Sequence, residues 1–168
     1  MVASALTSVE EYLGSVYNPD CDYIEGHLVE RNLGEVDHSD AQSSSLLFLR
    51  SNYPDNWVGV EVRVQVREDR YRVPDVTFVR GGKPQQRIIT SPPELVIEVL
   101  SPDDRAANLQ DRIEDYLSFG IRAVWVINPE NGRGFVYTRE GMHEARDGVL
   151  RSADGTIQMP LSAIFPVG

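Results

Sequence analysis

Residues 94–100 have the sequence ELVIEVL, and residues 123–127 have the sequence AVWVI. Nearly continuous apolar runs of this length are typical of strands that are covered on both faces of a sheet. Between them, residues 105–119 carry apolar side chains at helical spacing, and Gly120 follows where a helix would end. A strand, a helix and a second strand form a crossover unit, so we expect the two strands to be parallel neighbours in one sheet.

Further strands are predicted on both sides of this unit. Residues 57–67 alternate valine with polar side chains, which is the period of a strand with one buried face. Residues 71–79 return as a second strand, and Pro74 places it at an edge, starts it or breaks it locally, because proline has no backbone donor. Residues 134–157 predict a closing antiparallel meander, and residues 160–165 predict a short terminal helix.

The first part of the chain predicts two helices and a hairpin. Ser8, followed three residues later by a glutamate, is typical of a helix N-terminus. Residues 23–30 predict two short strands around a turn at Gly26, and His38 opens a second helix. The whole chain, residues 1–168, is therefore predicted to form a single domain of the α/β class (an α+β mixed sheet), with helices flanking a central mixed sheet.

The composition is that of an ordinary globular protein. The chain has 168 residues, of which 41% are apolar and 25% are charged, and its net charge is −10. This acidic balance argues against a protein that coats nucleic acid through bulk electrostatics, although a local basic patch is compatible with it. No apolar run approaches the about 18 residues of a membrane span, and the start of the chain lacks a signal-peptide pattern. The single cysteine, Cys21, favours a reducing, cytoplasmic location.

Two acidic residues stand where acids are unexpected. Glu98 lies inside the apolar run 94–100, and a buried carboxylate without a partner costs several kcal/mol. Asp75 follows Pro74 at the predicted break in the preceding strand. Two carboxylates and a backbone carbonyl at one point would suit a hard cation, Mg²⁺ or Mn²⁺. The alternative is that Glu98 pairs with a core arginine and Asp75 caps a turn.

The order of several motifs resembles a known family. Residues 72–79 (RVPDVTFV), 92–102 (PPELVIEVLSP) and 124–129 (VWVINP), with Tyr116 and Gly120 closing the intervening helix, are similar to the Uma-type restriction endonuclease family of the PD-(D/E)XK nuclease superfamily. The resemblance covers nearly the whole chain. It implies a restriction-endonuclease-like fold, DNA as the partner, and metal-dependent hydrolysis of DNA phosphodiester bonds.

The resemblance also implies roles for individual residues. Asp75 corresponds to the first metal ligand and Glu98 to the second, with the Val99 carbonyl as a third, for Mg²⁺ or Mn²⁺. Glu30 and His38 correspond to early family residues that line the site, although His38 at a helix start could equally be a surface residue. A homodimer is expected on the same grounds, because many nucleases of this superfamily pair to cut both strands.

The sequence departs from the family at its lysine. The superfamily position holds Leu100, and the family's shifted aspartate and lysine positions hold Asn108 and Arg112. Arginine can place positive charge beside a phosphate but does not release its proton near neutral pH. Arg112 is therefore a candidate electrostatic catalyst beside Asp75 and Glu98, with a structural ion pair to Glu98 as the alternative. A catalytically silent relative that binds DNA or a protein is the competing function.

Three arginines near the predicted turn at residues 68–69 form a candidate DNA-binding group. Arg63 and Arg67 are predicted to share one strand face, and Arg70 follows the turn. Guanidinium groups at such positions could contact the phosphate backbone. The alternative is that they form a solvated face with no ligand.

Overall fold

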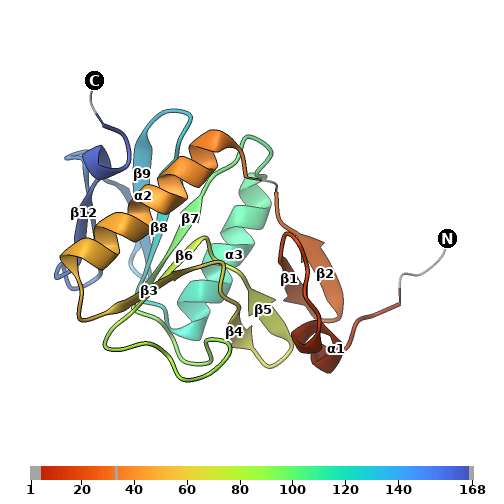
Figure 1. Cartoon of the computed structure of the whole chain (residues 1–168). Helices are drawn as coiled ribbons and strands as arrows, with labels where there is room; N and C mark the ends of the chain where they lie inside the picture. Colours follow the sequence, from red (N-terminus) through yellow and green to blue (C-terminus); the bar gives the residue numbers. More distant parts are fainter. Residues whose placement is uncertain (1–4, 33, 167–168) are drawn as a thin grey trace.

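A computed structural model describes residues 5–32 and 34–166 of the chain, and Figure 1 shows how its elements are arranged. The helices and strands follow one another in this order: α1 (Val9–Gly14), β1 (Cys21–Ile24), β2 (His27–Glu30), α2 (Val36–Asn52), β3 (Trp57–Val60), β4 (Val64–Arg67), β5 (Arg70–Arg72), β6 (Val76–Val79), β7 (Leu95–Val99), α3 (Ala106–Phe119), β8 (Ala123–Asn128), β9 (Arg133–Thr138), β10 (Gly141–Glu144), β11 (Val149–Arg151), β12 (Gln158–Pro160) and a 3₁₀ turn at Leu161–Ala163.

The strands form one large sheet and two smaller ones. The six-stranded sheet has the order β10-β9-β8-β7-β6-β3, the four-stranded sheet has the order β2-β1-β5-β4, and β11 pairs with β12. β7 and β8 are parallel, as the crossover around α3 requires, and the other neighbours in the large sheet are antiparallel. The predicted mixed sheet with flanking helices is confirmed.

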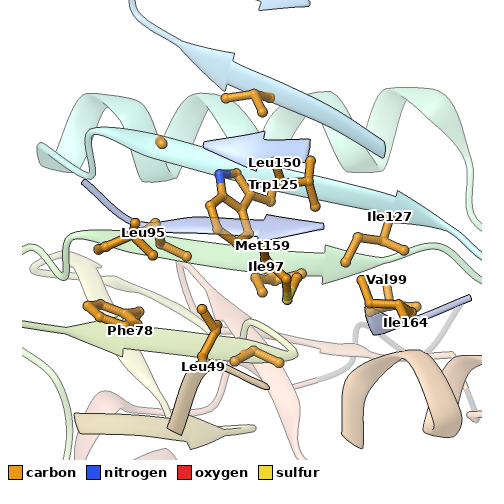
Figure 2. Packing of buried hydrophobic residues seen from close by; sticks show 14 of the residues in the cluster. Leu49, Phe78, Leu95, Ile97, Val99, Trp125, Ile127, Leu150, Met159 and Ile164 are labelled. Atoms are coloured by element: carbon orange, nitrogen blue, oxygen red, sulfur yellow. The ribbon is translucent and has the colours of Figure 1, made fainter. Parts of the chain in front are cut away.

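Both faces of the six-stranded sheet are covered, which explains why its central strands are mostly apolar. On one face, Leu49 of α2 belongs to the same cluster of buried side chains as Phe78 and Ile97 (Figure 2). On the other face, Ile113 of α3 belongs to a second cluster with Val96. The large sheet therefore lies between α2 and α3.

The alternation along β7 decides where its acid points. Leu95, Ile97 and Val99 belong to the α2 cluster, whereas Val96 belongs to the α3 cluster. Because successive side chains of a strand point to opposite faces, Glu98 lies on the face covered by α3. The acid is thus presented to the helix that follows it in the chain.

The prediction of one continuous strand over residues 57–67 is wrong. β3 ends at Val60 and joins the six-stranded sheet, whereas β4 begins at Val64 and joins the four-stranded sheet. Between them, Glu61 has a positive φ of 51°, which turns the chain out of the first sheet and into the second. A period of two cannot reveal such a change of sheet, because the alternation continues through it.

The break predicted at Pro74 is confirmed. As between β3 and β4, the chain changes from one sheet to the other at this point. β5 ends in the four-stranded sheet and β6 starts in the six-stranded one. The backbone N–H of Glu61 donates a hydrogen bond of 3.2 Å to the carbonyl of Asp75, so the two crossing points are joined to each other. Asp75 therefore lies at the seam between the two sheets.

Two helix boundaries differ from the prediction. α2 begins at Val36 rather than at His38, because the extended backbone of Glu35 already forms its N-cap. The terminal helix predicted over residues 160–165 is only a 3₁₀ turn, Leu161–Ala163. Among the described residues, no helix is long and apolar enough to cross a membrane.

Candidate functional site

Strand register brings the two unexpected acids together. β6 and β7 are antiparallel with Val76 opposite Ile97, and continuing this register by one residue sets Asp75 opposite Glu98. Both side chains are buried, with 2% of Asp75 and 1% of Glu98 exposed. The chain thus places two carboxylates on one face of the sheet, beside α3.

One oxygen of each carboxylate is held by a fixed neighbour. The backbone N–H of Val99 donates a hydrogen bond of 2.7 Å to Oδ2 of Asp75. The hydroxyl of Tyr116, on α3, donates a hydrogen bond of 2.6 Å to Oε1 of Glu98. These bonds orient the remaining oxygens, Oδ1 of Asp75 and Oε2 of Glu98.

The remaining oxygens face the same positive group. Nη2 of Arg31 lies 2.5 Å from Oδ1 of Asp75 and 4.0 Å from Oε2 of Glu98. The Nε atom of Arg112 lies 3.4 Å from the same Glu98 oxygen but makes no hydrogen bond to it. The two acids are therefore neutralised by two arginines, and Arg31 stands where the carboxylates converge.

The sequence left open that Glu98 pairs with an arginine and that Asp75 caps a turn, and the structure agrees with the first of these two points. Glu98 does lie beside an arginine, Arg112, as that alternative holds. Arg112 also lies 3.4 Å from Asp104, at the edge of the same pocket. Asp75 does not cap a turn, because its carboxylate accepts hydrogen bonds from the backbone of β7 and from the guanidinium of Arg31.

The surroundings shift the pKa values of the two acids in opposite directions, down for Asp75 and up for Glu98. Burial alone would raise the pKa of Asp75, but Arg31 and the contact with His38 outweigh burial and hold the pKa below its ordinary value. Burial raises the pKa of Glu98, and the charge of Asp75 adds to that effect while Arg112 offsets part of it. One carboxylate is therefore fixed as an anion, and its neighbour accepts a proton more readily.

His38 lies at the edge of this pair. Its Nε2 is 3.4 Å from Oδ1 of Asp75, and this neighbouring carboxylate raises the pKa of the imidazole above its ordinary value, although burial opposes the shift. The alternative in which His38 is an ordinary surface residue does not hold, since its side chain is only 12% exposed.

The site opens to solvent through two adjoining pockets. A pocket of about 390 Å³ reaches Glu98 and is also lined by Glu30, Asn108 and Arg112, and both Glu30 and Asn108 are exposed at its rim. A smaller pocket of about 190 Å³ reaches Asp75. The residues predicted from the family motif therefore gather around one hollow region of the surface.

Sequence reasoning missed several residues of this region. Arg31 and Asn32, like the predicted His38, line both pockets. Asp22 lines the larger pocket from the four-stranded sheet and binds Arg72 at 2.9 Å. Neither Arg31 nor Asp22 interrupts an apolar run, so the signal that revealed Glu98 was absent for both.

The arginines proposed for DNA binding do not form one surface. The prediction that Arg63 shares a strand face with Arg67 is wrong, because β4 begins only after Arg63. The guanidinium of Arg63 binds both carboxylate oxygens of Asp20, at 2.7 and 2.8 Å, and lies 4.2 Å from the centre of the Tyr12 ring. Arg63 therefore fastens α1 and the segment after it to the rest of the fold.

Arg67 and Arg70 lie beside the hairpin turn. Arg70 binds Asp115 at 3.1 Å and Glu25 at 2.8 Å, and 17% of its side chain is exposed. Arg67 is 54% exposed, and its nearest acids, the same two residues, are 3.8 and 3.9 Å away. Their contact with DNA remains a prediction, and Arg67 has the freer guanidinium.

The donor set can be compared with the needs of a divalent cation. Within residues 5–32 and 34–166, no three His, Cys, Asp or Glu side chains form a group able to hold a metal. Mg²⁺ is commonly held by one or two carboxylates, with waters and substrate phosphates completing its shell. Two carboxylates that converge on one cationic position beside an open pocket fit this pattern, provided that Arg31 leaves that position.

Comparisons with known proteins identify a family and a similar fold. The family model Uma2, described as "Putative restriction endonuclease", matches residues 9–165. A crystal structure from Anabaena variabilis, described as a putative nuclease belonging to DUF820, superposes with a TM-score of 0.79 at 22% sequence identity, covering 93% of this chain and 96% of that one. The expected restriction-endonuclease-like fold is thereby confirmed. A search of curated proteins found no match.

Proposed function

The chain belongs to the Uma2 family, and its fold is similar to that of a putative nuclease; we propose that it hydrolyses DNA phosphodiester bonds with the help of Mg²⁺ or Mn²⁺. The observation that carries this proposal is the convergence of Oδ1 of Asp75 and Oε2 of Glu98 on one position beside an open pocket. Phosphodiester hydrolysis needs charge neutralisation at the phosphate, and this position is where a cation would supply it.

Asp75 and Glu98 would hold the cation, with the Val99 carbonyl as a further oxygen ligand. A divalent cation supplies two things there: it lowers the pKa of a bound water and neutralises charge on the phosphoryl group. The hydrogen bonds from Val99 N–H and Tyr116 hydroxyl fix the two carboxylates before substrate arrives. This preorganisation is what an electrostatic site requires.

Arg112 would act on the phosphate rather than on the water. Its side chain lines the larger pocket beside Glu98, and among the described residues its buried Nε–H makes no hydrogen bond. A donor of this kind can stabilise negative charge that develops on a phosphoryl oxygen, but it cannot take a proton from water. The bound cation would itself make the water acidic enough to release that proton.

The rim of the site supplies contacts to the rest of the DNA. Glu30, His38 and Asn108 line the pocket, where His38 and Asn108 would donate hydrogen bonds to the DNA beside the scissile bond. Arg67 and Arg70, at the turn between β4 and β5, would contact the DNA backbone farther along the strand, Arg67 with the more exposed guanidinium. A homodimer would allow both strands to be cut, and sedimentation of the purified protein tests that state.

The direct test is cleavage of supercoiled plasmid with Mg²⁺ or Mn²⁺. We expect nicking by the wild-type protein and none by Asp75→Asn, which keeps the side-chain shape but removes the charge. Asp147→Asn, at an exposed acid that pairs with Arg151, is the matched control and should cleave like the wild type. Cleavage that survives in Asp75→Asn would point to another site or to a contaminant.

A second function is favoured by one observation. The carboxylates already have arginine partners, and Arg112 stands at the position where the family carries lysine. A catalytically silent relative that binds DNA or a protein would show this arrangement. It predicts retention of DNA in a gel shift without cleavage in any divalent metal, whereas the nuclease predicts both.

A further inference from the structure

The Arg31 side chain occupies the point at which the two acids of the site converge. Its Nη2 contacts Oδ1 of Asp75 and lies 4.0 Å from Oε2 of Glu98, the two carboxylate oxygens that Val99 and Tyr116 do not bind. Oδ2 of Asp75 and Oε1 of Glu98 are already bound by Val99 and Tyr116. A divalent cation that used both carboxylates would therefore have to take the position of the guanidinium.

Electrostatics makes the two occupants mutually exclusive. With Arg31 and Arg112 in place, the two positive charges balance the charges of Asp75 and Glu98. A divalent cation added to that arrangement would lie within a few ångströms of a guanidinium, and like charges at such distances repel. Departure of one arginine restores the negative charge that a cation needs.

Arg31 is the arginine that can leave. It follows β2 in the connection to α2, and it lines both the pocket that reaches Glu98 and the pocket that reaches Asp75. Arg112 lies within α3. Either pocket offers the Arg31 side chain room to move away from Oδ1 of Asp75 and Oε2 of Glu98.

We propose that Arg31 is a built-in competitor for the cation position: it neutralises Asp75 and Glu98 in the ion-free protein, and a divalent metal binds only by displacing it. This inference rests on the proposed function, because it concerns the same two carboxylates. Arg31 thereby lowers the metal affinity of the site. A phosphate group arriving in the pocket offers the displaced guanidinium a new partner, since its planar fork matches phosphate oxygens.

Calorimetric titration with Mn²⁺ tests the competition without relying on activity. Arg31→Gln removes the charge and should bind Mn²⁺ at least about tenfold more tightly than the wild type, since one unit charge leaves the position. Arg31→Lys keeps a cation there and should stay close to the wild type. Arg133→Gln, which removes an exposed arginine paired with Glu144 on β10, is the matched control and should leave Mn²⁺ affinity unchanged.

The outcomes separate this inference from the proposed function. Equal Mn²⁺ affinity in the wild type and Arg31→Gln would overturn the competition while leaving a metal site in place. Absence of Mn²⁺ binding in every folded variant, Arg31→Gln included, would overturn both. Tight binding in Arg31→Gln that disappears in Arg31→Gln/Asp75→Asn would assign the gained affinity to this site.

A second measurement uses the wild-type protein, in case Arg31→Gln does not fold. The side-chain ¹⁵Nε–H signal of Arg31, assigned by its absence from the spectrum of Arg31→Lys, reports on the ion pair directly. Saturation with diamagnetic Mg²⁺ should move this signal toward the position of a solvent-exposed arginine. A signal that stays in place while Mg²⁺ saturates the protein would overturn the proposal.

Discussion

The hydroxyl of Tyr116 lies 2.6 Å from Oε1 of Glu98, and both side chains are fully buried. This bond ties α3 to the central strand of the six-stranded sheet at the candidate site. It also gives a buried carboxylate one neutral donor besides the nearby arginines. Tyr116 therefore links the stability of the fold to the orientation of Glu98.

Tyr116→Phe should destabilise the protein and raise the pKa of Glu98 further. The substitution removes the donor but keeps the ring, so the buried carboxylate loses a hydrogen bond, at a cost of about 1–3 kcal/mol. Urea unfolding at pH 7 measures the loss. Tyr53→Phe removes a hydroxyl bound to Gln158 at an exposed position and should cost less. Equal losses in the two variants would contradict the importance of the Tyr116 bond.

Arg112 should contribute charge rather than proton transfer. We expect Arg112→Gln to lower the rate of DNA cleavage by about 100-fold, the usual effect of removing one donor that stabilises a transition state. Arg112→Lys keeps the charge and should retain most of the activity. The measurement is the single-turnover cleavage rate at saturating Mg²⁺. An Arg112→Lys variant as slow as Arg112→Gln would show that charge alone is not sufficient.

Arg63 and Arg67 should differ in what their loss affects. Arg63→Ala breaks the paired contacts with Asp20 and the stacking on Tyr12, so we expect a stability loss of about 1–3 kcal/mol. Arg67→Ala removes an exposed guanidinium and should leave stability nearly unchanged while weakening DNA retention at low salt. Thermal melts and gel shifts measure the two effects. A large stability loss in Arg67→Ala would contradict this division.

Gly59 should tolerate no side chain. An added Cβ would lie 2.3 Å from Cη2 of Trp57, so the indole would have to leave its place over the backbone of β3. We expect Gly59→Ala to cost about 1–3 kcal/mol, the usual penalty of overpacking, and to shift the tryptophan emission. Gly82→Ala, where nothing lies within 4 Å of the added atom, is the control and should change neither property.

Cys21 should be inert toward thiol reagents. Burial raises the pKa of its thiol to about 11, with the charge of Asp20 adding to the effect. The reactive thiolate is therefore scarce at pH 8 and becomes common only near the upper end of the pH range. We expect iodoacetamide to label the folded protein much more slowly than the urea-unfolded protein at pH 8. Equal labelling rates would contradict the burial of this thiol.

The central part of the fold could be predicted because its signals are local. The apolar runs of β7 and β8, the helical spacing of α3 and the glycine at its end each need only neighbouring residues to be recognised. Gly120 does adopt the left-handed conformation, with φ at 110°, that such a helix end favours. By contrast, the change of sheet at Glu61 depends on contacts with the distant segment around Asp75 and was missed.

In the candidate site too, residues marked by a local signal could be predicted, whereas residues placed by distant contacts could not. Glu98 is conspicuous in the sequence because a charge interrupts an apolar strand, and Pro74 marks the strand break beside Asp75. Arg31 lies in a polar connection where an arginine is ordinary, so nothing in its surroundings in the sequence distinguishes it. Its position depends on how the four-stranded sheet packs beside the six-stranded one, and sequence periodicity carries no information on that packing.

The seam between the sheets has a consequence for handling the protein. Asp75 and Glu98 obtain their counter-charges from arginines of the same chain, so folding does not depend on a captured ion. A chelator should therefore leave the melting temperature unchanged, in contrast to domains that are assembled around zinc. We therefore expect that metal can be stripped from the purified protein without unfolding it.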